Sequence, residues 1–189
     1  MAKIIAIVLA AGASRRHPGW PKLLREFGGV PLIARTLEMV ARCGFEETRV
    51  VIRANDAEMR SAARAFGFAV IENENAGRGV GSSIACGVPE PGAAIGAAIF
   101  LGDMPLIRPQ TVEKLRSNFE SGAGRVIRPV YNGAPGHPVF IAAEYFGALA
   151  RLSGDEGAAG IFKKSDVALI ATRDAGVVRD FDVAEDFAD

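Results

Sequence analysis

The sequence predicts an α/β protein with a doubly wound, mostly parallel sheet and a β-hairpin insertion. Short apolar runs alternate with segments of helical period up to about residue 120. A turn-rich stretch, NGAPGH, then lies between two further strand-like segments. Of the 189 residues, 49% are apolar, which is enough for one sizeable core. These observations favour a layered sheet with helices on both faces.

The first part of the chain supplies the parallel units. Residues 4–9 are apolar throughout, as expected of a strand buried on both faces. Residues 31–42 follow, with apolar side chains at helical spacing between a leading proline and Gly44. Later segments repeat the two patterns. The predicted strands are 48–52, 68–71 and 93–101, and the predicted helices are 56–66, 80–86 and 109–119.

The remainder of the chain departs from this alternation. Residues 125–131 and 138–141 flank the NGAPGH turn and predict the hairpin. Helices are expected at 142–150 and 156–164, strands at 167–171 and 177–181, and a short helix at the end. No repeat, low-complexity segment or linker divides the sequence. We therefore expect residues 1–189 to form a single Rossmann-like domain.

Charge and cysteine content exclude several classes of function. The 22 Lys and Arg residues balance 22 Asp and Glu residues, so no long-range attraction to nucleic acid or an anionic membrane is expected. Cys43 and Cys86 form neither a metal-type spacing nor a disulfide framework, which favours reduced core residues. The apolar run 4–11 is too short to span a bilayer, and cleavage after it would leave a leader below the usual ~15 residues. We predict a cytoplasmic protein.

The stretch LAAGASRRHPGWPKLL begins where the first predicted strand ends. Ligands of open α/β sheets sit outside the carboxyl ends of the strands, and small residues let backbone amides approach an anion. Arg15 and Lys22 would add positive charge, the first as a fork and the second as a point charge. The stretch matches neither a Walker loop nor GxGxxG. A phosphate site and a plain turn both stay open, and we expect Lys22 to face solvent without a ligand.

A second candidate stretch is FLGDMPLI, where an apolar strand ends in Asp103. A carboxylate there would point into the same crevice as the opening loop, and beside phosphates it indicates a Mg²⁺ site. A turn or helix-cap role for Asp103 is the alternative.

Three further segments carry weaker signals. In GRGVGSS, the glycine-rich turn with Gly79, Ser82 and Ser83 would present amides and hydroxyls to a base or ribose, or the serines would cap the next helix. GHPVF holds His137, and a lone histidine is more often structural than catalytic. In RDFDVAEDF, Asp182 would either face the crevice or cap the last helix, with a glutamate at capping-box distance.

The order LAAGxSxR…PKLL, GxGxxSS, GDMP resembles the MobA-like nucleotidyltransferase superfamily. The later GHPVF, LSGDEGAAGIF and RDFDVAEDF are similar to the molybdenum cofactor cytidylyltransferase branch, and the likeness runs through nearly the whole chain. It implies that the nucleotide is held by the backbone of the LAAG loop and by the glycine–serine segment, namely Leu9, Ala10, Ala11, Gly12, Gly79, Ser82 and Ser83.

The same resemblance implies roles for the charged residues. Arg15 and Lys22 would contact the triphosphate, Asp103 would bind Mg²⁺, and Asp182 would be a second metal ligand. His137, with the loop at 153–160, would hold the acceptor. Guanine-using relatives usually read LAGG, whereas LAAG matches pyrimidine users, so CTP is implied.

The expected activity is transfer of CMP from CTP to the terminal phosphate of molybdopterin, with release of pyrophosphate. A phosphate nucleophile needs no protein nucleophile, and no Ser-His-Asp or Cys-His spacing is present. The product implies transient contact with the enzyme that receives the cofactor. Two alternatives stay open, namely transfer to a sugar or polyol phosphate, and a non-catalytic nucleotide- or cofactor-binding protein.

Overall fold

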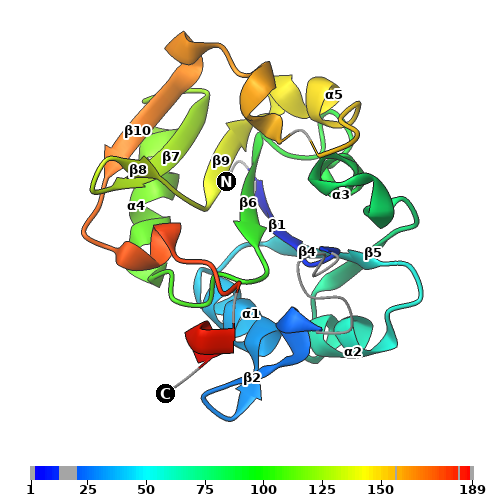
Figure 1. Ribbon diagram of the computed structural model, residues 1–189. Helices are drawn as coiled ribbons and strands as arrows, with labels where there is room; N and C mark the ends of the chain where they lie inside the picture. The colour runs from blue at the N-terminus through cyan, green and yellow to red at the C-terminus, as the bar shows by residue number, and fades with distance from the viewer. Residues whose placement is uncertain (1–2, 13–20, 156, 183, 188–189) are drawn as a thin grey trace.

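A computed structural model describes residues 3–12, 21–155, 157–182 and 184–187. Its central sheet has the strand order β10-β7-β9-β6-β1-β4-β5, and β8 pairs with β7 (Figure 1). The strands of this sheet are β1 (Ile4–Leu9), β4 (Glu47–Arg53), β5 (Ala69–Asn73), β6 (Gly96–Leu101), β7 (Val126–Tyr131), β8 (Ala134–Pro135), β9 (Val139–Ala142) and β10 (Val167–Ala171). The predicted α/β class with a mostly parallel sheet is confirmed.

Strands β5, β4, β1 and β6 form the wholly parallel half of the sheet. Their spatial order is the one of a doubly wound sheet, with the direction of winding reversing between β1 and β6. All six residues of β1 are buried, as its unbroken apolar run predicts. The carboxyl ends of β1 and β6 therefore lie side by side at the topological switch point.

Helices cover both faces of the sheet. Side chains of α1, α2 and α4 pack with Ile4, Ala6 and Val8 on one face, and those of α3 and α5 pack with Ile5 and Ile7 on the other. The helices are α1 (Leu32–Arg42), α2 (Ala57–Ala65), α3 (Val80–Gly87), α4 (Pro109–Glu120) and α5 (Phe146–Leu149). The predicted helix at 142–150 is present as a 3₁₀ turn, Ala143–Tyr145, followed by α5. None of the described helices is long and apolar enough to span a membrane.

The hairpin prediction is confirmed, because β9 pairs antiparallel with β7, and β7 gains β8 as a further partner. Strand β7 turns through Asn132 and Gly133, both at positive φ, into the two-residue strand β8. Strand β9 lies between β6 and β7 and runs antiparallel to both. A small ribbon that the sequence did not indicate, β2 (Glu26–Phe27) with β3 (Val30–Pro31), precedes α1.

Two predicted elements are wrong. The helix expected at 156–164 is replaced in its described part by 3₁₀ turns, Ala158–Ile161 and Lys164–Asp166. The strand expected at 177–181 is a 3₁₀ turn, Ala175–Val178, followed by irregular chain. Buried Asp174 accepts hydrogen bonds from Gly176 N and Thr111 Oγ1 and holds the turn. The apolar pattern there reflects a buried connecting segment, because Val177 and Phe181 are fully buried without joining the sheet.

Candidate active site

The switch point between β1 and β6 places the two predicted loops next to each other. Gly102 N donates to Leu9 O at 3.0 Å, so the end of β6 is joined to the start of the LAAG loop. On the other side, buried Thr36 of α1 donates from Oγ1 to Gly102 O at 2.9 Å. A Cβ at Gly102 would lie 3.1 Å from Leu9 O, which explains why glycine precedes Asp103. Asp103 is thereby fixed at the tip of a central strand.

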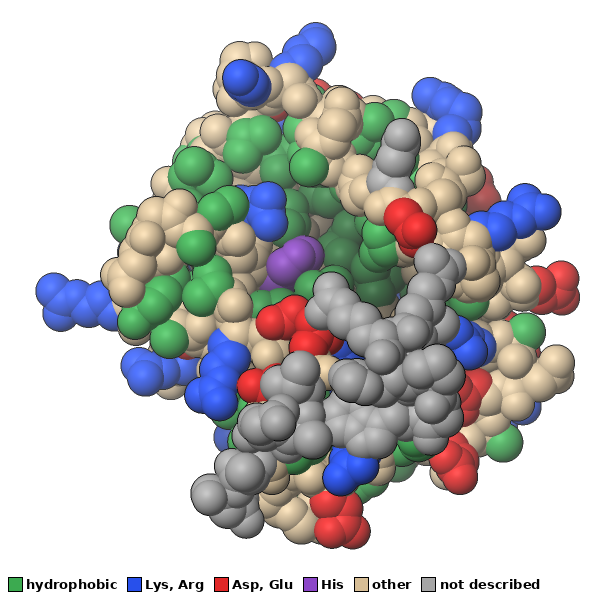
Figure 2. Space-filling model, in the orientation of Figure 1, with side chains coloured by type: hydrophobic (Ala, Val, Ile, Leu, Met, Phe, Trp, Pro, Cys, Tyr) green, Lys and Arg blue, Asp and Glu red, His purple; other side chains and the backbone are tan. Residues whose placement is uncertain are grey.

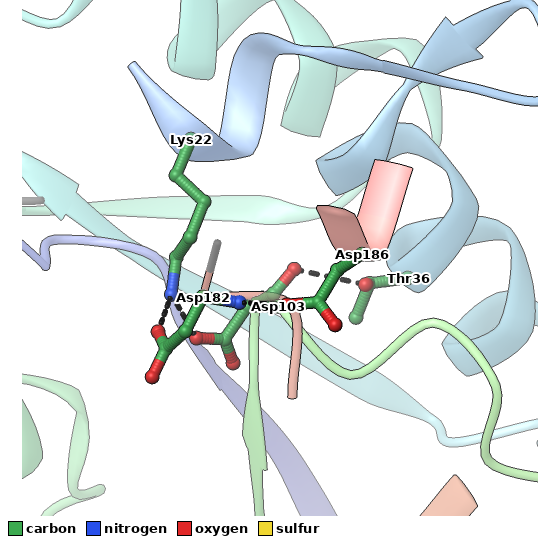
Figure 3. A network of polar contacts seen from close by, with 6 residues as sticks. Lys22, Thr36, Asp103, Asp182 and Asp186 are labelled. Carbon is green, nitrogen blue, oxygen red and sulfur yellow. Dashed lines mark hydrogen bonds and ion pairs between the residues drawn. The ribbon is translucent and has the colours of Figure 1, made fainter. Parts of the chain in front are cut away.

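Lys22 joins the two aspartates that the sequence singled out. Its Nζ donates to Asp103 Oδ2 at 2.6 Å and to Asp182 Oδ1 at 2.7 Å (Figure 3). The Lys22 side chain is only 14% exposed, so the expectation that it faces solvent is wrong. Burial works to lower the Lys22 pKa, but Asp103 and then Asp182 raise it on balance. Lys22 therefore carries a firm positive charge between two carboxylates.

Three carboxylates meet at this point. Asp103, Asp180 and Asp182 each place an oxygen so that these atoms lie within 4.8 Å of one another. Loss of hydration and then the charge of Asp182 raise the pKa of Asp180 from its ordinary value. Buried Asp103 Oδ1 has no hydrogen-bond partner within the described part of the chain. Carboxylate oxygens are the ligands that Mg²⁺ prefers, so the donor set and the unsatisfied oxygen fit a divalent cation.

The chain end that carries Asp182 is held in place by backbone and ring contacts. Phe181 N donates to Asp103 O at 3.1 Å, and Asp182 N donates to Asp186 Oδ2 at 2.8 Å. The Phe181 ring packs edge-on against Phe27, with centroids 4.7 Å apart. The Asp182 carboxylate points toward Lys22 (Figure 3). This favours the prediction that Asp182 faces the crevice over the prediction that its side chain caps the last helix.

The glycine–serine segment is organised by a residue that the sequence did not indicate. Asn73, buried at the end of β5, donates from Nδ2 to Ser82 Oγ at 3.0 Å and to Ser83 Oγ at 3.1 Å. Ser82 Oγ also donates to Gly79 O at 2.8 Å. Neither serine caps α3, whose N-cap is Gly79 without a side-chain bond. The cap alternative for the serines is therefore wrong.

The turn before α3 contacts the loop at 153–160. Gly81 N donates to Gly154 O at 3.0 Å. Gly79 has φ +110°, and a Cβ there would lie 2.4 Å from Gly154 O. Only glycine fits this close approach at a positive φ. The predicted nucleotide segment and the predicted acceptor loop are thus adjacent.

A cavity of about 560 Å³ opens beside the acidic cluster and is lined by His137 and by residues 157–159. Figure 2 shows an apolar hollow with a histidine in it and acidic side chains at its edge. Most of its lining is aliphatic, including Leu9, Ile99 and Ile141, and its basic members are Arg128 and Lys164. Burial, helped by the charge of Arg128, lowers the His137 pKa to about 4, so the ring is neutral at pH 7.

The LAAG loop shows one limit on its predicted role. Ala10 N donates to Val51 O at 2.8 Å, so this amide belongs to the sheet. Ala11 O accepts from Arg53 Nε at 3.2 Å, whereas Gly12 is exposed with open space around it. Arg15 lies outside the described residues. The residues that the sequence did not reveal are Asn73, Arg128 and Asp180.

A doubly wound sheet with a charged, cation-compatible cluster at its switch point fits an enzyme that transfers a phosphoryl or nucleotidyl group. Residues 6–169 match the MobA-like NTP transferase domain, and the chain belongs to this family.

Proteins with several different names are similar to this chain. The probable molybdenum cofactor guanylyltransferase of Pyrococcus horikoshii is 29% identical over 87% of this chain and 80% of its own length. The nicotine blue oxidoreductase of Paenarthrobacter nicotinovorans is 27% identical over 96% of this chain and 93% of its own. The chain spans only 29% of the length of a bifunctional protein GlmU from Halorhodospira halophila, which is 27% identical over 67% of this chain.

A solved structure extends the likeness to the whole fold. Rv0371c from Mycobacterium tuberculosis H37Rv is 27% identical and superposes with a TM-score of 0.81, covering 98% of this chain and 96% of that one. A second structure of Rv0371c is a complex with manganese.

Proposed function

We propose that the protein transfers CMP from CTP to the terminal phosphate of a molybdopterin-type acceptor and releases pyrophosphate. The observation that carries the proposal is the cluster in which Lys22 lies between Asp103 and Asp182 at the switch point. Phosphoryl transfer of this kind depends on positioning and charge stabilisation, and the cluster offers both charges in one place. The three residues of the cluster come from distant parts of the chain.

In this proposal each charged residue has one task. Lys22, with Arg15, binds the β- and γ-phosphates and stabilises the charge that develops on leaving pyrophosphate. Asp103 and Asp182 would hold Mg²⁺, with Asp180 within reach as a third carboxylate. That ion, when bound, supplies positive charge at the reacting phosphates. The acceptor phosphate attacks the α-phosphorus in line, so the protein provides no covalent nucleophile.

The base is proposed to be cytosine. The LAAG sequence at residues 9–12 supports a pyrimidine, and Asn73 orients the hydroxyls of the neighbouring serines. The Pyrococcus relative is named a guanylyltransferase, so the choice of base is the point on which this chain would differ from it. Gly12, Gly79 and Ser82 would contact the nucleotide in this proposal, whereas Ser83 is buried and is bonded to Asn73.

The acceptor is proposed to lie in the cavity beside His137. A polyol or sugar would leave hydroxyl groups without partners against its aliphatic walls, whereas a flat ring system buries its faces there. This lining favours a molybdopterin-type acceptor over a sugar or polyol phosphate. We also propose that the protein acts in the cytoplasm and makes transient contact with the enzyme that receives the product.

Two measurements test the proposal. Equilibrium binding of CTP and GTP with Mg²⁺ should show tighter CTP binding, because in this proposal the base pocket holds one ring and excludes a purine. Tighter GTP binding would refute the pyrimidine assignment alone. Metal-dependent pyrophosphate release separates an enzyme from a non-catalytic nucleotide-binding protein, which would bind CTP without releasing pyrophosphate.

A further inference from the structure

Arg128 is a cation in the wall of a mostly aliphatic cavity. It projects from β7, which also contributes Val126 to the lining, and it is partly buried. Burial lowers the pKa of its guanidinium from the ordinary value, which reflects the cost of removing the charge from water. In the described part of the chain no carboxylate forms an ion pair with Arg128. Burying a charge without a counter-ion destabilises the folded protein, and a bound ligand with an anionic group would supply that counter-ion.

The hydrogen bonds of Arg128 leave part of its guanidinium unused. Its Nε donates to Gly136 O at 3.0 Å, and one terminal nitrogen lies 3.5 Å from Pro135 O. A guanidinium has five N–H donors in a fixed fork, so these two carbonyls orient the group and leave further donors for a partner. A purely structural role in bracing the β7–β8 hairpin would not require the charge to lie in the cavity wall.

The neighbouring polar groups make Arg128 the main positive charge within the cavity. His137 is neutral at pH 7 because its pKa is about 4. Lys164 also lines the cavity, but its side chain is exposed to solvent, where its charge is screened. Acidic side chains lie at the edge of the hollow (Figure 2), and the carboxylates of the acidic cluster would repel an anion placed near them.

We propose that Arg128 determines acceptor specificity by pairing with an anionic group carried on a ring system whose faces pack on the aliphatic walls, at the end of the acceptor away from its reacting phosphate. This inference rests on the proposed function in naming the ligand as the acceptor. The aliphatic walls bury the faces of the ring, and the guanidinium fork binds the anion by charge-assisted hydrogen bonds. An acceptor with the same ring and no second anion would bind less tightly.

A pair of fluorescent probes tests the pairing directly. 8-Anilinonaphthalene-1-sulfonate has an apolar ring system with a sulfonate, and N-phenyl-1-naphthylamine has the same rings without it. The wild-type protein should bind the sulfonate about 10- to 100-fold more tightly, the range expected of hydrogen bonds to a charged group. Arg128→Met should remove this preference and leave the affinity for the neutral probe unchanged, and Arg128→Lys should retain part of it.

The control is Arg42→Met on α1, whose side chain is 68% exposed and pairs with Glu38 outside the cavity. It should bind both probes as the wild-type protein does. Equal affinity of the wild-type protein for the two probes would overturn the proposal, as would a sulfonate preference that survives Arg128→Met. If Arg128→Met does not fold, Arg128→Lys decides the matter, because a sulfonate preference as large as that of the wild-type protein in this variant would also overturn the proposal.

The probe assay tests the anion site and the pyrophosphate assay tests the proposed transfer, so either claim can be refuted without the other. A sulfonate preference that depends on Arg128, together with no pyrophosphate release from CTP, would keep the anion site and refute the proposed transfer. Pyrophosphate release without that preference would keep the transfer and refute the role of Arg128.

Discussion

His137 should make folding stability depend on pH in a defined window. The His137 ring lines the cavity, is partly buried, and has Nδ1 3.5 Å from Ile99 O. Burial lowers its pKa to about 4, against 6.5 for a free histidine. Between these two values the unfolded chain binds a proton that the folded chain does not. Stability therefore falls as pH decreases from about 6.5 to about 4, and this contribution is constant outside that window.

The size of the effect follows from the shift. Each pKa unit corresponds to about 1.4 kcal/mol, so a shift from 6.5 to about 4 corresponds to about 3.5 kcal/mol in full. About 3 kcal/mol of this falls between pH 7 and pH 4, because His137 of the folded protein is itself half protonated at pH 4. His137→Gln keeps a polar side chain of similar length that does not titrate in this range. The free energy of unfolding of the variant should lack this pH-dependent loss, because its other titrating groups are those of the wild-type protein.

The assay is urea unfolding of both proteins at steps of half a pH unit from 4 to 7.5. The difference in unfolding free energy, wild type minus variant, should rise with pH by about 3 kcal/mol and level off above pH 7. Parallel curves across the whole range would show that His137 titrates as a solvated ring, and the account of a neutral His137 in the cavity would then be wrong.

Three further variants address the active site. Lys22→Met should lower kcat/KM about 10²- to 10³-fold, and it should also lower Tm because Nζ pairs with two carboxylates; wild-type turnover would contradict the phosphate role. Asp103→Asn should nearly abolish Mg²⁺-dependent turnover. Asp182→Asn should raise the Mg²⁺ concentration needed for half-maximal rate. If Asp182→Asn lowers Tm but leaves the Mg²⁺ dependence unchanged, Asp182 has only a structural role. Gly79→Ala should raise KM for CTP and cost about 1–3 kcal/mol of stability, since φ is +110° and its Cβ would meet a backbone carbonyl. Gly77→Ala, which meets nothing within 4 Å, is its control, and equal effects of the two would contradict the close-approach argument.

The parallel half of the fold and the position of Asp103 were predictable because both depend on local pattern. An apolar run reports a buried strand, and a carboxylate after it must lie at the sheet edge where ligands bind. The bond between Lys22 and Asp182 spans 160 positions in the sequence and depends on how the chain end packs. No local sequence pattern reveals this contact, which is why the prediction that Lys22 faces solvent was wrong.

The missed elements have related causes. The run around Val177 and Phe181 is apolar because a connecting segment crosses the core, and burial without a partner strand has the same sequence pattern as a strand. Arg128 occupies a strand position where a cation usually faces solvent, and only the cavity beside it makes it unusual. Asn73 acts through two serines that lie on the next helix, which periodicity does not reveal.

The central claim is that the protein moves a nucleotidyl group and does not merely bind one. The most direct test follows isotope from CTP labelled at the α-phosphorus, with Mg²⁺ and a molybdopterin acceptor, for the wild-type protein and Asp103→Asn. Label should appear in a CMP–acceptor product in equal amount to the pyrophosphate released, and Asp103→Asn should form neither. Label that stays in CTP, or that appears only as free CMP, with the wild-type protein would contradict the account.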